Sequence, residues 1–256
     1  MVDHGAAPLP LRRLVTRAWP SMRHRNARQG RGEPSEMVRA ASFPHYTAAE
    51  LALDRALHAV ALLLAVGGVG WLLVVTAQTG GIRRMVGLAI YSAGLIGMFA
   101  ASAAYNSCSP CHGKELLRRI DHAMIFVMIA GTCTPFALTA FPATMGLLTC
   151  ILVWFIAATG AALKLAFPRR FERLLIALYL VMGWTIFGMS RAYADNLSDV
   201  ALFLLLGGGL AYSCGAYVQA RGRTPFHNVV WHGLVLIGAG LHWVAVANQA
   251  MTLRSV

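Results

Sequence analysis

The segment "ALHAVALLLAVGGVGWLLVVTA", residues 56–77, contains one ionisable side chain, that of His58. A helix of about 20 apolar residues crosses the hydrocarbon core of a bilayer, so this segment predicts a membrane span. Its glycines, among them Gly67 and Gly68, are tolerated in membrane helices. The segment therefore predicts an integral membrane protein.

The rest of the chain repeats this pattern. Of its 256 residues, 57% are hydrophobic and 12% are charged, about half the charged share of an ordinary soluble domain. Seven apolar runs of sufficient length occur, at about 56–77, 85–105, 121–141, 144–165, 173–190, 199–219 and 228–249. The sequence thus predicts an all-α integral membrane protein with seven transmembrane helices.

The basic residues predict the orientation of these helices. Of the Lys and Arg residues, 18 fall on the side of the N-terminus and four on the opposite side. Under the positive-inside rule the N-terminus is cytoplasmic and the C-terminus is outside, in a multi-pass protein of the plasma membrane. The net charge of +12 then indicates cytoplasmic anchoring at lipid rather than nucleic-acid binding.

The first 45 residues differ in composition from the seven-helix domain expected at 46–252. The stretch "PLRRLVTRAWPSMRHRNARQGRG" is rich in Arg and has no apolar core, so it is no secretory signal. We expect residues 1–45 to form a basic, disordered cytoplasmic tail. A transit peptide, or a start codon assigned too early, would also account for this composition.

The string Cys108-Ser109-Pro110-Cys111-His112 has the C-x-x-C-H pattern of c-type haem attachment. It joins the second and third spans, which the orientation places in the cytoplasm, where thiols are kept reduced. Haem attachment in bacteria takes place on the other side of the membrane. We therefore expect a plain loop, with cytoplasmic metal or redox chemistry as the alternative.

Polar side chains gather at the cytoplasmic ends of four predicted helices. Ionisable residues inside spans are costly, and each is a functional hypothesis. One of them taken alone has a structural explanation, such as an acid that complements a helix dipole. Their convergence instead predicts a polar cavity for a metal or for acid–base chemistry. The residues are Glu50, Asp54 and His58; Ser102 and Asn106; Asp121 and His122; and His227, Asn228, His232 and His242.

The segments that carry these residues resemble the hemolysin III family, which is related to the progestin and adipoQ receptors. They include "RRIDHAMIFVMIAGTCTPF" at 118–136 and "FHNVVWHGLVLIGAGLHWVAV" at 226–246. The resemblance extends over about residues 45 to 250 and excludes the basic tail. It implies seven spans with a cytoplasmic N-terminus, in agreement with the distribution of basic residues.

The resemblance also implies a buried zinc near the cytoplasmic face. Relatives hold it with a His of the second span and two His spaced H-x-x-x-H on the seventh. The wider superfamily includes ceramidase-type lipid amidases, which use this zinc to activate water. On this chain the implied roles are a metal ligand at His232, a base or water holder at Asp121, and a hydrogen-bond donor at Ser102.

Two features depart from the family pattern. Asn106 stands where relatives have the ligand His, and an amide is a poor zinc ligand. His227 and His232 are five residues apart, which turns their rings about 140° away from each other instead of about 40°. The position four before His232 holds Asn228.

Two arrangements could still bind zinc. A wide turn or π-bulge could bring the ring of His227 round to His232. Alternatively the ligands have moved, and His232 joins His58, His122 or His112 in a new set.

These observations predict a zinc-assisted hydrolase that acts on lipid amides or esters at the cytoplasmic leaflet. The alternative is a non-catalytic, receptor-like or regulatory protein that binds lipid beside a degenerate metal site. A pore-forming role is implied only by the family's name. The sequence itself shows no conduction pathway. The expected partners are membrane lipids and a lipid substrate or ligand, with no nucleic acid.

Overall fold

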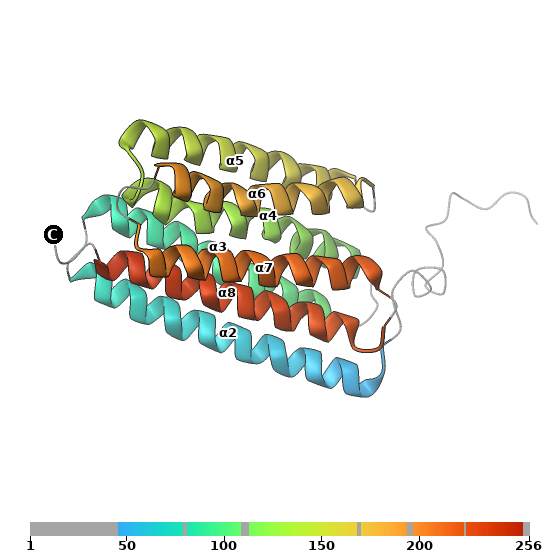
Figure 1. Cartoon of the computed structure of the whole chain (residues 1–256). Coiled ribbons are helices and arrows are strands. Elements are labelled where there is room, and N and C mark those ends of the chain that lie inside the picture. Colours follow the sequence, from blue (N-terminus) through green and yellow to red (C-terminus); the bar gives the residue numbers. More distant parts are fainter. Residues whose placement is uncertain are drawn as a thin grey trace, which may run out of the picture. The chain divides into compact units, whose positions relative to one another are not determined.

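The structure, a computed structural model, is helical throughout the part of the chain that it describes. This part comprises residues 46–78, 81–108, 113–167, 170–193, 197–222 and 224–252, and it contains no strand. The helices are α2 (Ala48–Ala77), α3 (Ile82–Ser107), α4 (Lys114–Thr139), α5 (Ala143–Ala166), α6 (Glu172–Tyr193), α7 (Asp199–Arg221) and α8 (His227–Thr252) (Figure 1). The predicted tail at 1–45, Cys111 and His112 lie outside the described residues.

Six of the described helices are long and apolar enough to cross a membrane: α2, α3, α4, α5, α7 and α8. The remaining helix, α6, has a shorter apolar stretch at Leu174–Met189. Large apolar side chains also face outward, among them Leu63, Phe155 and Phe203, which are 70% or more exposed. Such a surface suits lipid and not water. The chain is therefore a multi-pass, all-helical membrane protein.

The helices begin earlier than the apolar runs. Helix α2 starts at Ala48 because Thr47 caps it, and the Glu50 side chain completes the capping box. Helix α4 likewise starts at Lys114, ahead of the run predicted at 121–141. Hydropathy marks only the part of a helix that suits hydrocarbon, whereas the backbone hydrogen bonds continue beyond it. Asp54 thus lies inside a helix and not in a loop.

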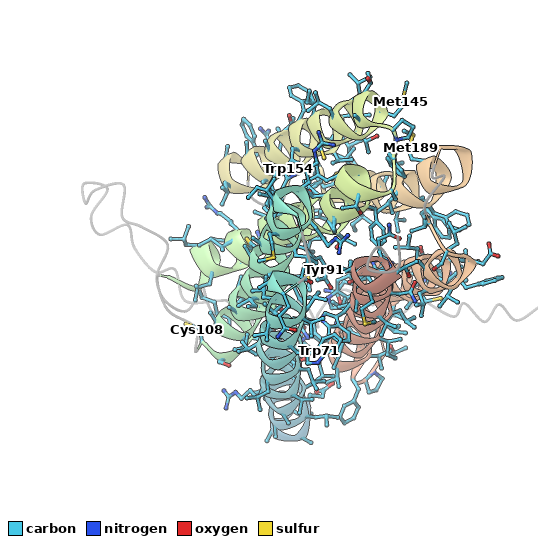
Figure 2. All side chains as sticks on the ribbon, turned by 90° about the vertical axis from the view of Figure 1, so that its left-hand side faces the viewer. Trp71, Tyr91, Cys108, Met145, Trp154 and Met189 are labelled. Carbon is cyan, nitrogen blue, oxygen red and sulfur yellow. The ribbon has the colours of Figure 1, made fainter. Side chains whose placement is uncertain are left out.

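Each helix packs against the next one in the chain, and α8 packs back against α2 (Figure 1). Helix α4 also contacts α6 and α8, so it lies at the centre of this arrangement. Figure 2 shows Tyr91 in the interior and Met145 at the edge. The core contains Tyr91, Phe126 and Phe136, which are fully buried. The contact between α8 and α2 brings the two ends of the domain together.

Helix α5 approaches α4 closely at two glycines. A Cβ atom on Gly146 would collide with the backbone carbonyl oxygen of Ala137, and one on Gly160 would collide with the ring of Phe126. Small residues permit this approach in membrane bundles, where packing drives helix association. The α4–α5 interface therefore depends on these positions.

The substitution Gly146→Ala tests this contact. The obstacle is backbone and cannot rotate away, so we expect a loss of about 1–3 kcal/mol in the free energy of unfolding in detergent. Gly70→Ala is the control, because a Cβ there meets nothing within 4 Å. Equal stability of the two variants would contradict the close α4–α5 packing.

Candidate functional site

Helices α2, α3 and α8 bring four buried polar side chains into contact. We call Asp54, His58, Ser102 and His232 the polar cluster. Their exposed fractions are 4%, 3%, 8% and 8%, so all four are removed from solvent. Buried polar groups of this kind must satisfy one another, because no water competes for them inside the bundle.

Asp54 and His232 form the shortest contact of the polar cluster. Asp54 Oδ1 lies 2.6 Å from His232 Nδ1, and a carboxylate can only accept, so the imidazole donates. The contact is a charge-assisted hydrogen bond between α2 and α8. With Nδ1 as the donor, Nε2 carries the lone pair in the neutral ring of His232. Asn228 Nδ2 lies 3.5 Å from His232 Nδ1, and since both nitrogens carry protons this approach is no hydrogen bond.

His58 connects the polar cluster to α3. Its Nδ1 lies 2.7 Å from the backbone carbonyl oxygen of Asp54, to which it donates. Its Nε2 lies 3.0 Å from Ser102 Oγ, so the serine hydroxyl donates to an unprotonated nitrogen. Asp54 Oδ2 is 3.6 Å from His58 Nδ1. The arrangement directs the proton of Ser102 at an imidazole that has a carboxylate beside it.

The polar cluster could hold a metal ion. One ligand atom from each of Asp54, His58 and His232 lies within 4.8 Å of the other two. A carboxylate and two imidazoles are ligands that zinc and other transition metals accept. His58 and His232 are among the residues of the relocated ligand set that the sequence left open. Asp54 joins them because it lies one turn before His58 on the same face of α2.

The ligand positions implied by the family resemblance lie elsewhere. The amide nitrogen of Asn106 donates to the carbonyl oxygen of Ser102 at 2.9 Å. The ring of His227 packs against Tyr46, and its Nδ1 lies 3.1 Å from the carbonyl oxygen of Thr224. Helix α8 is regular from His227 onward, so no bulge turns this ring toward His232. A zinc held by three histidines of α3 and α8 does not fit these side chains.

Glu50 lies at the same end of the bundle and has a structural role. Its Oε1 accepts a hydrogen bond from the backbone N–H of Phe226 at 2.8 Å, and its Oε2 accepts from Thr47. These bonds join the start of α2 to the start of α8. Burial raises the pKa of the nearby Tyr46 phenol, and the carboxylates of Asp54 and Glu50 raise it further. Glu50 and Asp54 therefore both lie near the start of α2 but have different partners, Phe226 directly before α8 and His232 within it.

The other predicted site residues lie outside the polar cluster. Asp121 is within electrostatic range of His58, and its Oδ2 lies 3.8 Å from His122 Nδ1. His122 Nδ1 is bonded to a backbone carbonyl of its own helix. His242 is buried deeper in α8, with Nε2 at 3.2 Å from the carbonyl oxygen of Leu205. None of these three belongs to the metal-compatible set found in the described residues.

Comparisons with known proteins agree with this fold. The family model described as "Haemolysin-III related" matches residues 52–243. The Hemolysin-3 homolog of Bacillus subtilis (strain 168) is 32% identical over 189 residues, which are 74% of this chain and 89% of that protein. Hemolysin-3 of Bacillus cereus is 28% identical over 198 residues, 77% of this chain and 90% of that protein.

A more distant relative is the heptahelical transmembrane protein ADIPOR2 of Oryza sativa subsp. japonica. It is 30% identical over 175 residues, which are 57% of this chain and 73% of that protein. No solved structure gives a significant match.

A double-mutant cycle tests the Asp54–His232 contact. We expect Asp54→Ala and His232→Ala to be coupled by about 1.5–3 kcal/mol in the free energy of unfolding, as for a hydrogen bond to a charged group. Asp54→Ala combined with His242→Ala is the control and should be additive within about 0.5 kcal/mol. Equal coupling in both cycles would contradict the contact.

Proposed function

This chain belongs to the hemolysin III family, and we propose that it is a metal-dependent hydrolase of lipid amide or ester bonds with zinc at the polar cluster. The observation that supports the proposal is the composition of this cluster. A carboxylate, two imidazoles and a serine hydroxyl meet inside an apolar bundle. Buried groups of this kind are costly in a membrane and mark functional sites.

The orientation that we propose places the polar cluster at the cytoplasmic leaflet of the plasma membrane. This orientation is supported by the Lys and Arg residues, of which 18 fall on the side of the N-terminus and four on the opposite side. The apolar stretch Leu174–Met189 of α6 supplies the seventh span, and the rice relative is named a heptahelical transmembrane protein. Asp54 lies near the start of α2 and Ser102 near the end of α3, which meet at that leaflet.

The residues of the polar cluster have separable roles in this proposal. Asp54, His58 and His232 would hold zinc once Ser102 turns away from His58 Nε2, and the zinc would polarise a lipid carbonyl or activate water. The Asp54 carboxylate orients the ring of His232 through their hydrogen bond. The Ser102 hydroxyl donates to the oxyanion that develops on the carbonyl. Asp121, which is within electrostatic range of His58, would accept a proton or hold the attacking water.

A second candidate is a receptor-like or regulatory protein that binds lipid without turnover. It is favoured by Asn106 and Asn228, which stand where the resemblance implies zinc-binding histidines. Lipid binding tolerates the loss of a metal ligand, and hydrolysis does not.

Metal content tests the proposed site. We expect about one zinc per chain in the detergent-purified protein by mass spectrometry, and its loss in His58→Ala and His232→Ala. His227→Ala and His242→Ala are the controls, and they should keep the zinc because their rings have other partners. Zinc that persists in His232→Ala would contradict the site.

Hydrolysis of a fluorescent ceramide and of a phospholipid ester tests the activity. We expect Ser102→Ala to keep its zinc and to lose about 10²–10³-fold in kcat, as when an oxyanion donor is removed. Zinc binding without any turnover of either lipid would overturn the hydrolase proposal in favour of the lipid-binding protein.

A further inference from the structure

Lys164 lies in the last turn of α5, and its side chain is only 5% exposed. Its ammonium group has one polar contact among the described residues, with Glu172 Oε1 at 4.0 Å. That distance exceeds the range of a hydrogen bond. An ammonium group removed from water is costly unless an anion approaches it closely. The surroundings of Lys164 therefore favour an anionic ligand.

A second cation points at the same oxygen atom. Arg118 donates to Glu115 from Nε and Nη2 at 3.1 and 2.8 Å, and its remaining Nη1 lies 3.7 Å from Glu172 Oε1. Glu172 itself is half exposed, at 51%, so its carboxylate is loosely held. Its Oε1 marks a position between the buried Lys164 and the partly buried Arg118 where an anionic oxygen is stabilised.

Arg119 adds a third positive charge at this junction of α4, α5 and α6. It donates to a backbone carbonyl at the end of α5, which fixes the guanidinium there. Its Nε is buried, lacks a hydrogen-bond partner, and lies 3.6 Å from Glu115 Oε1. We call Arg118, Arg119 and Lys164, with Glu115 and Glu172, the basic junction. Three cations face two carboxylates, so the basic junction carries excess positive charge.

The surface beside the basic junction is apolar. Leu165, Phe167, Phe171 and Leu174 surround it on the end of α5 and the start of α6, and each is between 42% and 61% exposed. Acyl chains can cover such residues, whereas a free phosphate would leave them in water. A lysine that only snorkels to the interface keeps its ammonium in water, in contrast to Lys164. The anion is therefore best supplied by a lipid.

We propose that the basic junction binds the phosphate group of an anionic phospholipid. Lys164 and Arg118 contact the phosphate oxygens, as basic pockets between membrane helices do. Glu172 competes for the same cations and swings away when the lipid binds. The basic junction lies on α4, α5 and α6, whereas the polar cluster lies on α2, α3 and α8. Lipid binding here does not depend on hydrolysis or on zinc.

Native mass spectrometry of the full chain in detergent, titrated with phosphatidylglycerol or phosphatidylcholine, tests the proposal. We expect tighter binding of phosphatidylglycerol, and a loss of about tenfold in affinity in Lys164→Met. Arg55→Gln is the matched control, because it removes an exposed positive charge from α2, outside the junction. Its affinity should stay within about twofold of the parent.

The variant Glu172→Gln distinguishes an effect on the binding site from a folding defect. This variant removes the competing carboxylate, so we expect tighter binding of phosphatidylglycerol, an effect that misfolding does not produce. Unchanged affinity in Lys164→Met, or equal affinity for the two lipids, would overturn the proposal. If inorganic phosphate displaces phosphatidylglycerol at similar concentration, the site binds free phosphate and the lipid assignment is wrong.

Discussion

The hydrogen bond between Asp54 and His232 is the constraint on which the arrangement depends, because it joins the first described helix to the last. Inside a bilayer a buried carboxylate cannot turn to water, so it needs a partner from a neighbouring helix. One turn earlier, Glu50 accepts from the backbone of Phe226 and fixes the same two helices at their starts. These two hydrogen bonds fix both the separation and the register of α2 and α8. Interactions between residues close in sequence do not determine either of them.

Once this register is fixed, the remaining contacts of the polar cluster follow. His58 lies one turn after Asp54, so it faces α3, where Ser102 donates to its Nε2. Asn106, one turn after Ser102, donates to the carbonyl oxygen of Ser102 at 2.9 Å and approaches its hydroxyl at 3.4 Å, but it does not reach the imidazoles. The residues that could bind a metal therefore come from α2 and α8, and α3 contributes a hydroxyl. The resemblance implied a different division, with one ligand from α3 and two from α8.

The apolar runs are sufficient to predict a helical membrane protein, because the cost of burying polar groups in lipid leaves little alternative. They place the helix starts less well, since capping by Thr47 extends α2 ahead of its apolar run. The spacing of Asp54 and His58 predicts a shared helix face, and both side chains are buried. Sequence spacing does not show that Glu50 would bond to α8 while Asp54 bonds to His232. That outcome depends on helix rotation, which is set by packing between distant segments.

The two polar regions differ in how completely their charges are satisfied. In the polar cluster, Asp54 and both imidazoles have partners at 3.0 Å or less. In the basic junction, Arg118 is bonded to Glu115 at 2.8 and 3.1 Å, whereas Lys164 approaches Glu172 only at 4.0 Å. Groups that are already hydrogen-bonded are preorganised for chemistry. An unpaired positive charge, in contrast, is stabilised when an anion binds to it. Chemistry on a lipid therefore suits the polar cluster, and recognition of a headgroup suits the basic junction.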